Sequence, residues 1–177
     1  MTVLFSDVAG STALGERLDP ESLRRLMGRY FDAMRDVLEH HGGTVEKFIG
    51  DAIMAVFGIP RLHEDDALRA VRAAAEMRER LANLNEDLRT EVGVEIAART
   101  GIHTGEVVAG DPGRGQTLVT GDAVNTAARL EQAAGAGEIL IGESTYRLVR
   151  DAVVANPIEP VDAKGKAEPV PAYRLDG

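Results

Sequence analysis

The chain has 177 residues, of which 44% are hydrophobic and 28% charged, and this fits one globular domain with its own core. Its formal net charge of -9 argues against broad binding to nucleic acids or anionic membranes, because both need a basic surface. It contains no cysteine, which excludes disulfides, thiolate nucleophiles and Cys-based zinc sites. Every apolar run falls short of the ~18 residues that a membrane span needs, and no signal peptide opens the chain. We therefore expect a cytoplasmic location, with no membrane contact by this domain.

A short apolar strand is expected over residues 2–6, and Asp7 follows it directly. Residues 8–12 (VAGST) are small, so their backbone N–H groups can face a ligand, and a helix is expected to begin near Ser11 or Thr12. Backbone donors at the start of a helix attract anions. An ordinary connection between a strand and a helix is the simpler alternative, and these residues alone favour it.

A long helix is expected to begin at Asp19, because a capping residue is followed by Pro and then by an acid. Residues 44–58 are rich in β-branched and aromatic residues, and we expect them to form the two strands of a hairpin with a tight turn at Gly50 and Asp51. Lys47 and Asp51 are charged residues inside this apolar segment. Either they form a solvated strand face and a polar tip, or they have a function. The hairpin alone does not decide between the two.

A second long helix is expected to begin at residues 63–66, and a strand is expected over residues 94–103. A further helix should run from residues 120–122 to about Ala134. Asn125 and Arg129 are four residues apart in it and share one face. An exposed Asn and Arg without a function is the plain alternative for this pair.

The remaining segments are a loop, a strand, a short helix and a tail. Residues 110–117 have the GxxxxG spacing of a phosphate loop, but Gln116 stands where that motif needs Lys, so we expect a solvent loop. A strand is expected over residues 138–141 and a helix over residues 143–150. The tail, residues 151–177, is rich in Pro, and we expect it to be irregular apart from an edge strand at Tyr173 to Leu175.

The order strand, helix, hairpin, helix, strand is the ferredoxin-like βαββαβ pattern. It predicts an α+β fold with a mainly antiparallel sheet, helices packed on one face and a C-terminal extension. The first and third strands then lie side by side, which brings Asp7 towards Asp51. Two carboxylates on rigid strands suit a pair of divalent ions about 3.5–4 Å apart, which can clamp the oxygens of a phosphoryl displacement. Mg²⁺ needs only one or two carboxylates when substrate phosphates supply other ligands.

Four segments, taken together and in order, resemble the catalytic domain of class III nucleotidyl cyclases. They are residues 5–12 (FSDVAGST), 46–51 (EKFIGD), 101–105 (GIHTG) and 121–130 (GDAVNTAARL). The resemblance extends from residue 2 to about residue 175. We therefore expect residues 1–177 to form one such catalytic domain, excised from a longer protein in which it is fused to other domains.

The resemblance implies an adenylate cyclase, a phosphorus–oxygen lyase that converts ATP to 3′,5′-cyclic AMP and pyrophosphate. Asp7 and Asp51 would bind two Mg²⁺ or Mn²⁺ ions per site; one ion would lower the pKa of the ribose 3′-hydroxyl, and the other would hold the triphosphate. Lys47 would bind adenine at a ring nitrogen, where guanylyl members carry Glu. Asn125 would orient the ribose. Arg129 would stabilise charge on the transferring phosphoryl group.

The resemblance also implies phosphate contacts from two further places. The backbone of one segment would cradle the phosphates, and it comprises Val8, Ala9, Gly10, Ser11 and Thr12. Lys164, in the tail, would reach the triphosphate. Family members act as head-to-tail dimers, in which one chain supplies the metal-binding Asp residues and the other supplies the base, ribose and transition-state residues. We therefore expect a homodimer with composite active sites.

Leu118 departs from the family pattern. The family usually carries Asp, Thr or Ser seven residues before the Asn, where the side chain contacts the adenine amino group. Leucine has neither donor nor acceptor, so the selectivity between ATP and GTP stays open.

Two functions of different classes remain. The first is an active adenylate cyclase, which the presence of both Asp residues, Lys47, Asn125 and Arg129 favours. The alternative is a weakly active or inactive nucleotide-binding regulatory module that signals to a fused domain through dimerisation. Leu118 favours this alternative. A diguanylate cyclase is opposed by the absence of that family's Gly-Gly-acidic-Glu-Phe turn.

Overall fold

The computed structural model describes residues 1–9, 11–49, 52–59, 61–106, 108–109, 119–162 and 169–176. Its elements, in chain order, are β1 (Thr2–Ala9), α1 (Ser11–Arg17), α2 (Pro20–His40), β2 (Thr44–Ile49), β3 (Ala52–Phe57), α3 (Asp66–Glu91), β4 (Ala97–Thr104), β5 (Val108–Ala109), β6 (Val119–Thr120), α4 (Asp122–Ala133), β7 (Ile139–Gly142), α5 (Glu143–Val149), β8 (Ala155–Val161) and β9 (Val170–Leu175). In the described part of the chain, seven strands form one sheet in the order β2-β3-β1-β4-β7-β9-β8, and β5 pairs with β6.

The ferredoxin-like core is confirmed. Strand β1 lies in the middle of the sheet and pairs antiparallel with β3 on one side and with β4 on the other. The first and third strands are therefore neighbours, as the sequence predicts. Beyond this core, β4 pairs with β7 in parallel, while β9 pairs antiparallel with both β7 and β8.

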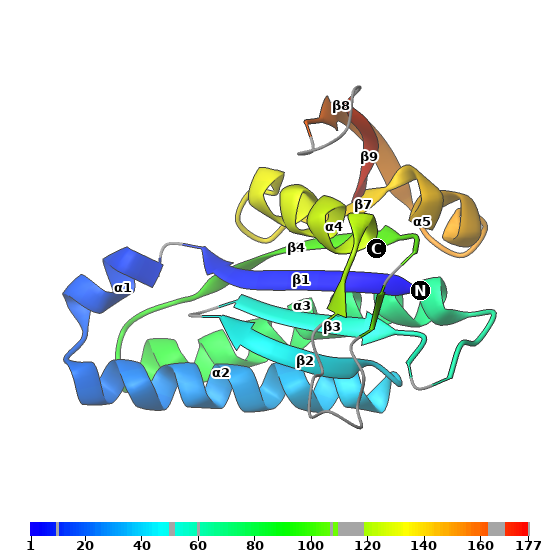
Figure 1. The fold of residues 1–177 in the computed structure, drawn as a ribbon. Coiled ribbons are helices and arrows are strands. Elements are labelled where there is room, and N and C mark those ends of the chain that lie inside the picture. Colours follow the sequence, from blue (N-terminus) through cyan, green and yellow to red (C-terminus); the bar gives the residue numbers. More distant parts are fainter. Residues whose placement is uncertain are drawn as a thin grey trace.

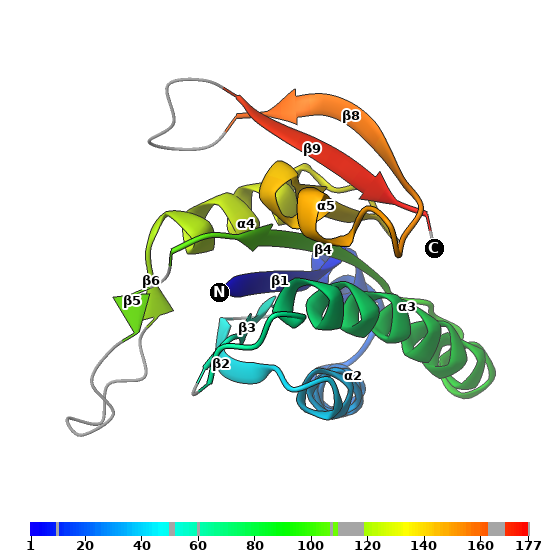
Figure 2. The same ribbon diagram turned by 90° about the vertical axis from the view of Figure 1, so that its right-hand side faces the viewer.

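Helices cover the central strands on both faces. Helices α2 and α3 pack together on one face, whereas α4 packs across β1 and β4 on the other (Figures 1 and 2). The alternation of side chains along β1 explains how one strand serves both layers. Leu4 and Val8 belong to the core under α2 and α3, while Val3 packs with Ala123 and Ala127 of α4. The expectation of helices on one face thus holds for α2 and α3, and α4 adds a third layer.

Helix α2 begins as its sequence predicts. The backbone N–H of Ser22 donates to Oδ1 of Asp19 at 2.8 Å, and the Ser22 hydroxyl donates to Oδ2 at 2.9 Å. These hydrogen bonds, the backbone one first, lower the pKa of the Asp19 carboxyl below its ordinary value. One stripe of α2 is buried and comprises Leu26, Tyr30, Met34, Val37 and Leu38.

The C-terminal tail differs from the expectation. It is not irregular, because residues 155–161 form β8, which pairs with β9. Pro157 and Pro160 argue against a strand in the sequence, because Pro has no backbone N–H to donate to a neighbouring strand. Strand β8 is an edge strand of the sheet, where this loss is tolerated. Strand β9 lies between β7 and β8, so it is not an edge strand. Tyr173 of β9 stacks on Tyr146 of α5, with ring centroids 3.8 Å apart.

None of the helices in the described ranges is both long enough and apolar enough to cross a bilayer.

Candidate active site

Asp7 lies near the end of the central strand β1, on the sheet face that α4 covers. Its register partner in β4 is Arg99. The Nε of Arg99 donates to Oδ1 of Asp7 at 2.8 Å, and Nη2 donates to Oδ2 at 3.2 Å. The Asp7 side chain is only 15% exposed. This fork-to-carboxylate contact therefore holds Asp7 in one orientation.

Arg99 also faces a second carboxylate, on α4. Its Nε lies 3.2 Å from Oε1 of Glu131, whose side chain is 7% exposed, and its Nη1 donates to the carbonyl of Gln132 at 3.3 Å. Asp7 and Glu131 thus share one guanidinium. The arrangement ties the central strand of the sheet to the last turns of α4.

Gly101 allows this close approach between α4 and the sheet. A Cβ at this position would overlap the backbone nitrogen of Glu131 and the carbonyl oxygen of Ala127. Because neither backbone atom can move without moving the helix, the position requires Gly. The Gly that opens the segment at residues 101–105 therefore has a packing reason.

Asn125 and Arg129 lie on the outer face of α4, away from the sheet. Both residues are exposed, and Nη1 of Arg129 donates to Oε1 of Gln132 at 3.3 Å. The opposite face of the helix is buried and comprises Ala123, Thr126, Ala127, Leu130 and Glu131. Within one chain, α4 itself therefore separates these two side chains from the sheet face that carries Asp7.

The comparison with known proteins identifies, over the whole chain, the cyclase family that the sequence segments resemble. The model of the adenylate and guanylate cyclase catalytic domain matches residues 1–177. The chain belongs to this family. Adenylate cyclase 1 of Rhizobium meliloti is 31% identical to this cyclase domain over 182 residues, which cover 100% of the domain and 27% of the relative. An adenylate cyclase of Mycobacterium tuberculosis is 32% identical over 167 residues, which cover 93% of the domain and 37% of the relative.

Solved cyclase structures share the fold. The adenylyl cyclase CyaB from P. aeruginosa matches with a TM-score of 0.91 at 35% identity, over 99% of this domain and 93% of that chain. The guanylyl cyclase Cya2 matches with a TM-score of 0.89 at 36% identity, over 99% and 91%. The cyclase domain is therefore similar to enzymes of both base specificities. It spans well under half the length of the two curated relatives, so their whole-protein activities do not transfer directly.

Several expected site residues lie outside the described residues: Gly10, Asp51, Leu118 and Lys164. The register nevertheless bears on Asp51, because Ala52, the next residue in the sequence, pairs with Asp7. Lys47 belongs to β2 and pairs with Met54 of β3, and its side chain is outside the described part of the domain.

The expected phosphate segment does join a strand to a helix, since β1 ends at Ala9 and α1 begins at Ser11. Val8 is 4% exposed, and its side chain packs into the core under α2 and α3. Only its backbone is therefore available to a phosphate. The side chains of Ser11 and Thr12 are outside the described part of the domain.

The carboxylate of Asp7 is a suitable ligand for a hard divalent cation, although Arg99 donates a hydrogen bond to each of the two carboxylate oxygens. A carboxylate is the ligand type that Mg²⁺ takes alongside water and substrate phosphates. The described residues contain no group of three or more His, Asp or Glu placed to hold a metal. A cation at this position would therefore depend on a second carboxylate and on the substrate, and it would displace at least one contact of Arg99.

Sequence reasoning missed Arg99 and Glu131. Arg99 lies two residues before the segment that begins at Gly101, on the same strand face as Gly101, and Glu131 directly follows the segment that ends at Leu130. Their positions beside the motifs were visible in the sequence. Their contact was not, because it depends on the register of β1 against β4 and on how α4 packs.

Proposed function

We propose that this cyclase domain is an adenylate cyclase, which converts ATP to 3′,5′-cyclic AMP and pyrophosphate at sites shared between two copies of the chain. The observation that carries the proposal is the outward orientation of Asn125 and Arg129 on α4, away from Asp7. Residues that act on one substrate cannot face away from each other within a single site. A second copy, whose α4 faces the Asp7 side of the first, resolves this.

Asp7 and Asp51 would hold two Mg²⁺ or Mn²⁺ ions in one copy. When bound, such ions supply positive charge to the triphosphate and acidify the ribose 3′-hydroxyl. Arg99 keeps the Asp7 carboxylate oriented towards this face of the sheet through its two hydrogen bonds. The backbone from Val8 to Thr12 and the Lys164 side chain would contact the phosphates.

The other copy would supply the groups that orient ATP. Lys47 would bind the adenine ring, Asn125 would orient the ribose, and Arg129 would stabilise the negative charge on the transferring phosphoryl group. The 3′-oxygen then bonds to the α-phosphorus, the bond from that phosphorus to the pyrophosphate oxygen breaks, and the hydroxyl proton leaves to solvent. The exposed position of Arg129 leaves its guanidinium available for this role.

ATP is the substrate that the residues favour. Lys47 replaces the Glu expected of guanylyl members, and the two relatives reported above are named adenylate cyclases. Leu118 opposes this assignment, since it offers no hydrogen bond to the adenine amino group. It supports the second candidate, a regulatory module that binds nucleotide with little or no turnover.

The test is cyclic nucleotide production by the purified domain. ATP and GTP are supplied separately, with Mn²⁺ and then with Mg²⁺, over a range of protein concentrations. Asp51→Ala serves as the blank, and Asp32→Ala, which removes an exposed acid of α2 on the opposite side of the sheet, serves as the matched control. We expect cyclic AMP from the wild type and from Asp32→Ala, rising more than linearly with protein, and none from Asp51→Ala.

Two outcomes would change the assignment. Turnover by a well-folded Asp51→Ala variant would contradict the two-metal site. Nucleotide binding without product from either nucleotide would favour the regulatory module. In that case Leu118→Thr is the next variant, because a hydroxyl at the base would restore the missing hydrogen bond and ATP turnover with it.

A further inference from the structure

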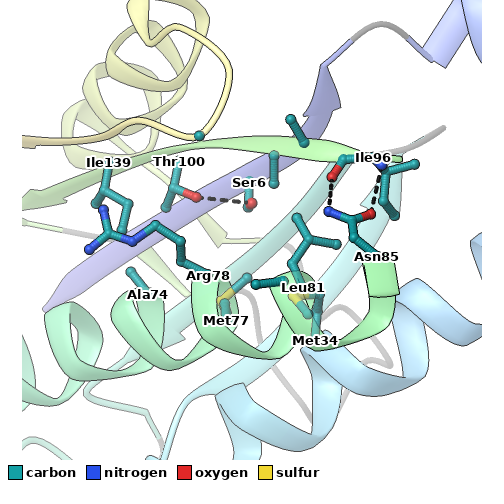
Figure 3. A pocket seen from close by; sticks show the side chains of 14 residues that line it. Ser6, Met34, Ala74, Met77, Arg78, Leu81, Asn85, Ile96, Thr100 and Ile139 are labelled. Atoms are coloured by element: carbon teal, nitrogen blue, oxygen red, sulfur yellow. Dashed lines mark hydrogen bonds between the residues drawn. The ribbon is translucent and has the colours of Figure 1, made fainter. Parts of the chain in front are cut away.

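A cavity of about 170 Å³ lies between α3 and the sheet, on the face away from Asp7 (Figure 3). Its walls are mostly apolar and include Met34 of α2, Met77 and Leu81 of α3 and Ile139 of β7. Several of the other lining residues are small, among them Ala74, and they leave the space unfilled. An apolar cavity of about 150 Å³ is large enough for a benzene-sized molecule.

The floor of this cavity carries two buried hydroxyl groups. The Oγ of Ser6 and the Oγ1 of Thr100 lie 3.1 Å apart and form one hydrogen bond. Two hydroxyls have two protons, and one bond uses only one of them. Among the interactions of the described residues, the second proton has no acceptor. It is available to an acceptor atom of a bound molecule.

Arg78 of α3 supplies the charge at one end of the cavity. It is half-buried and has no ion pair with any described residue, whereas Arg69, Arg80 and Arg89 of the same helix each pair with an acid. The described residues that line the cavity include no Asp or Glu. In Figure 3 the guanidinium of Arg78 lies towards the end where Thr100 and Ile139 are. A half-buried cation beside apolar walls favours an anion there.

Asn85 closes the opposite end. Its Nδ2 donates to the carbonyl of Ile96 at 2.8 Å, and its Oδ1 accepts from the N–H of Ile96 at 2.8 Å (Figure 3). Both polar ends of the amide are engaged with the backbone. The cavity is therefore polar and positive at one end only, with a hydrocarbon-lined remainder.

We propose that this cavity is a binding site for a small aliphatic monocarboxylate of about six or seven non-hydrogen atoms, the size class that such a volume admits. The carboxylate lies between the guanidinium of Arg78 and the hydroxyl of Thr100, and the alkyl chain packs against Met77, Leu81 and Met34. The site does not depend on the cyclase reaction, because its residues face the other side of the sheet.

The experiment is a titration of the purified domain with butyrate, observed through ¹³C-labelled methionine methyl groups. The chain has five Met residues. Met34 and Met77 line the cavity, while Met1, Met27 and Met54 do not and serve as internal references. We expect saturable shifts of the Met34 and Met77 methyls only. Butyramide has the same shape without the charge, and we expect it to bind roughly tenfold more weakly or worse.

Two variants isolate the charge. Arg78→Gln should weaken butyrate binding roughly tenfold or more. Arg72→Gln removes an exposed cation of the same helix outside the cavity and should leave binding unchanged. Absence of saturable shifts at Met34 and Met77, equal binding of butyrate and butyramide, or equal affinities of Arg78→Gln and wild type would each overturn the proposal.

Discussion

Arg99 is shared by two carboxylates that approach it from different elements. Asp7 comes from the central strand and Glu131 from α4, and their side chains are 15% and 7% exposed. Without the guanidinium, two negative charges would face each other in a largely buried site. For a cation to bind Asp7, the same guanidinium must give up at least one of its two hydrogen bonds to that carboxylate. We therefore expect Arg99 to stabilise the fold and to compete with the proposed metal ion for the same carboxylate.

Arg99→Gln should accordingly have opposite effects on stability and on metal response. We expect the free energy of unfolding without metal to fall by about 1–3 kcal/mol, less than for a fully buried pair because Arg99 is partly exposed. Urea unfolding measures this change. Mn²⁺ should raise the Tm of the variant more than that of the wild type, because Asp7 is then unopposed.

Arg89→Gln provides the comparison for that variant. Arg89 pairs with Glu95 at 2.8 Å on the surface, with both side chains more than half exposed. Its loss should change stability by no more than about 1 kcal/mol. Equal losses of unfolding free energy in the two variants would show that the contacts of Arg99 with Asp7 and Glu131 stabilise the fold no more than an exposed ion pair does.

At the scale of elements, the packing of α4 on the sheet depends on one absent side chain. Gly101→Ala places a Cβ against the backbone of α4 at Ala127 and Glu131. We expect a loss of about 1–3 kcal/mol or more in the free energy of unfolding, since the helix must move outward. Gly28→Ala is the matched control, because Gly28 is exposed inside α2 and a Cβ there meets nothing within 4 Å.

The control should change stability in the other direction. Alanine in the interior of a helix is favoured over Gly by roughly 0.5–1 kcal/mol. Both changes add the same methyl group, so urea unfolding of the two variants separates packing from backbone effects. If Gly101→Ala is as stable as Gly28→Ala, α4 does not pack as the structure has it.

The cap of α2 predicts a pH-dependent effect. The pKa of Asp19 is lowered in the folded chain by the hydrogen bonds from Ser22. Its contribution to stability is therefore present above its ordinary value of 3.8 and is lost as the pH falls through the lowered value. Asp19→Ala should lower the Tm at pH 7, and the difference from wild type should shrink towards pH 2. A difference that stays constant over this range would contradict the role of the ionised carboxylate.

The elements that sequence reasoning placed well have local signals, and those it missed depend on distant contacts. The start of α2 was readable because Asp19, Pro20 and Glu21 are adjacent. Strand β8 was missed because Pro157 and Pro160 argue against a strand unless its place at the edge is known. In the site, the helical spacing of Asn125 and Arg129 put both on one exposed face. The Arg99 contacts could not be read, because they join three elements that are remote in the sequence.

At the scale of the whole molecule, the proposed site shared between two copies predicts the activity of mixtures of inactive variants. Asp51→Ala and Arg129→Ala should each be nearly inactive alone, because each destroys one half of every site. Mixed in equal amounts, half of the dimers are mixed, and each of these has one intact site. We expect roughly a quarter of wild-type activity, measured as cyclic AMP formed after subunit exchange.

A second mixture serves as the control. Asp7→Ala and Asp51→Ala both damage the half that would bind metal, so their mixed dimers contain no intact site. Recovery of activity in this mixture would contradict the assignment of Asp7 and Asp51 to the same half of the site. Absence of activity in the first mixture would contradict the assignment of Asp51 and Arg129 to opposite halves.

The central strands carry different chemistry on their two faces in immediate succession. Ser6 and Thr100 face the cavity beneath α3, while their neighbours Asp7 and Arg99 face α4. Because side chains alternate along a strand, a shift of one residue exchanges the two faces completely. Deleting a single codon within β1 would turn Asp7 under α3, away from Arg99, and would turn Ser6 towards α4; a deletion within β4 would do the same to Arg99 and Thr100. We therefore expect these two strands to accept many substitutions over time but no change in length.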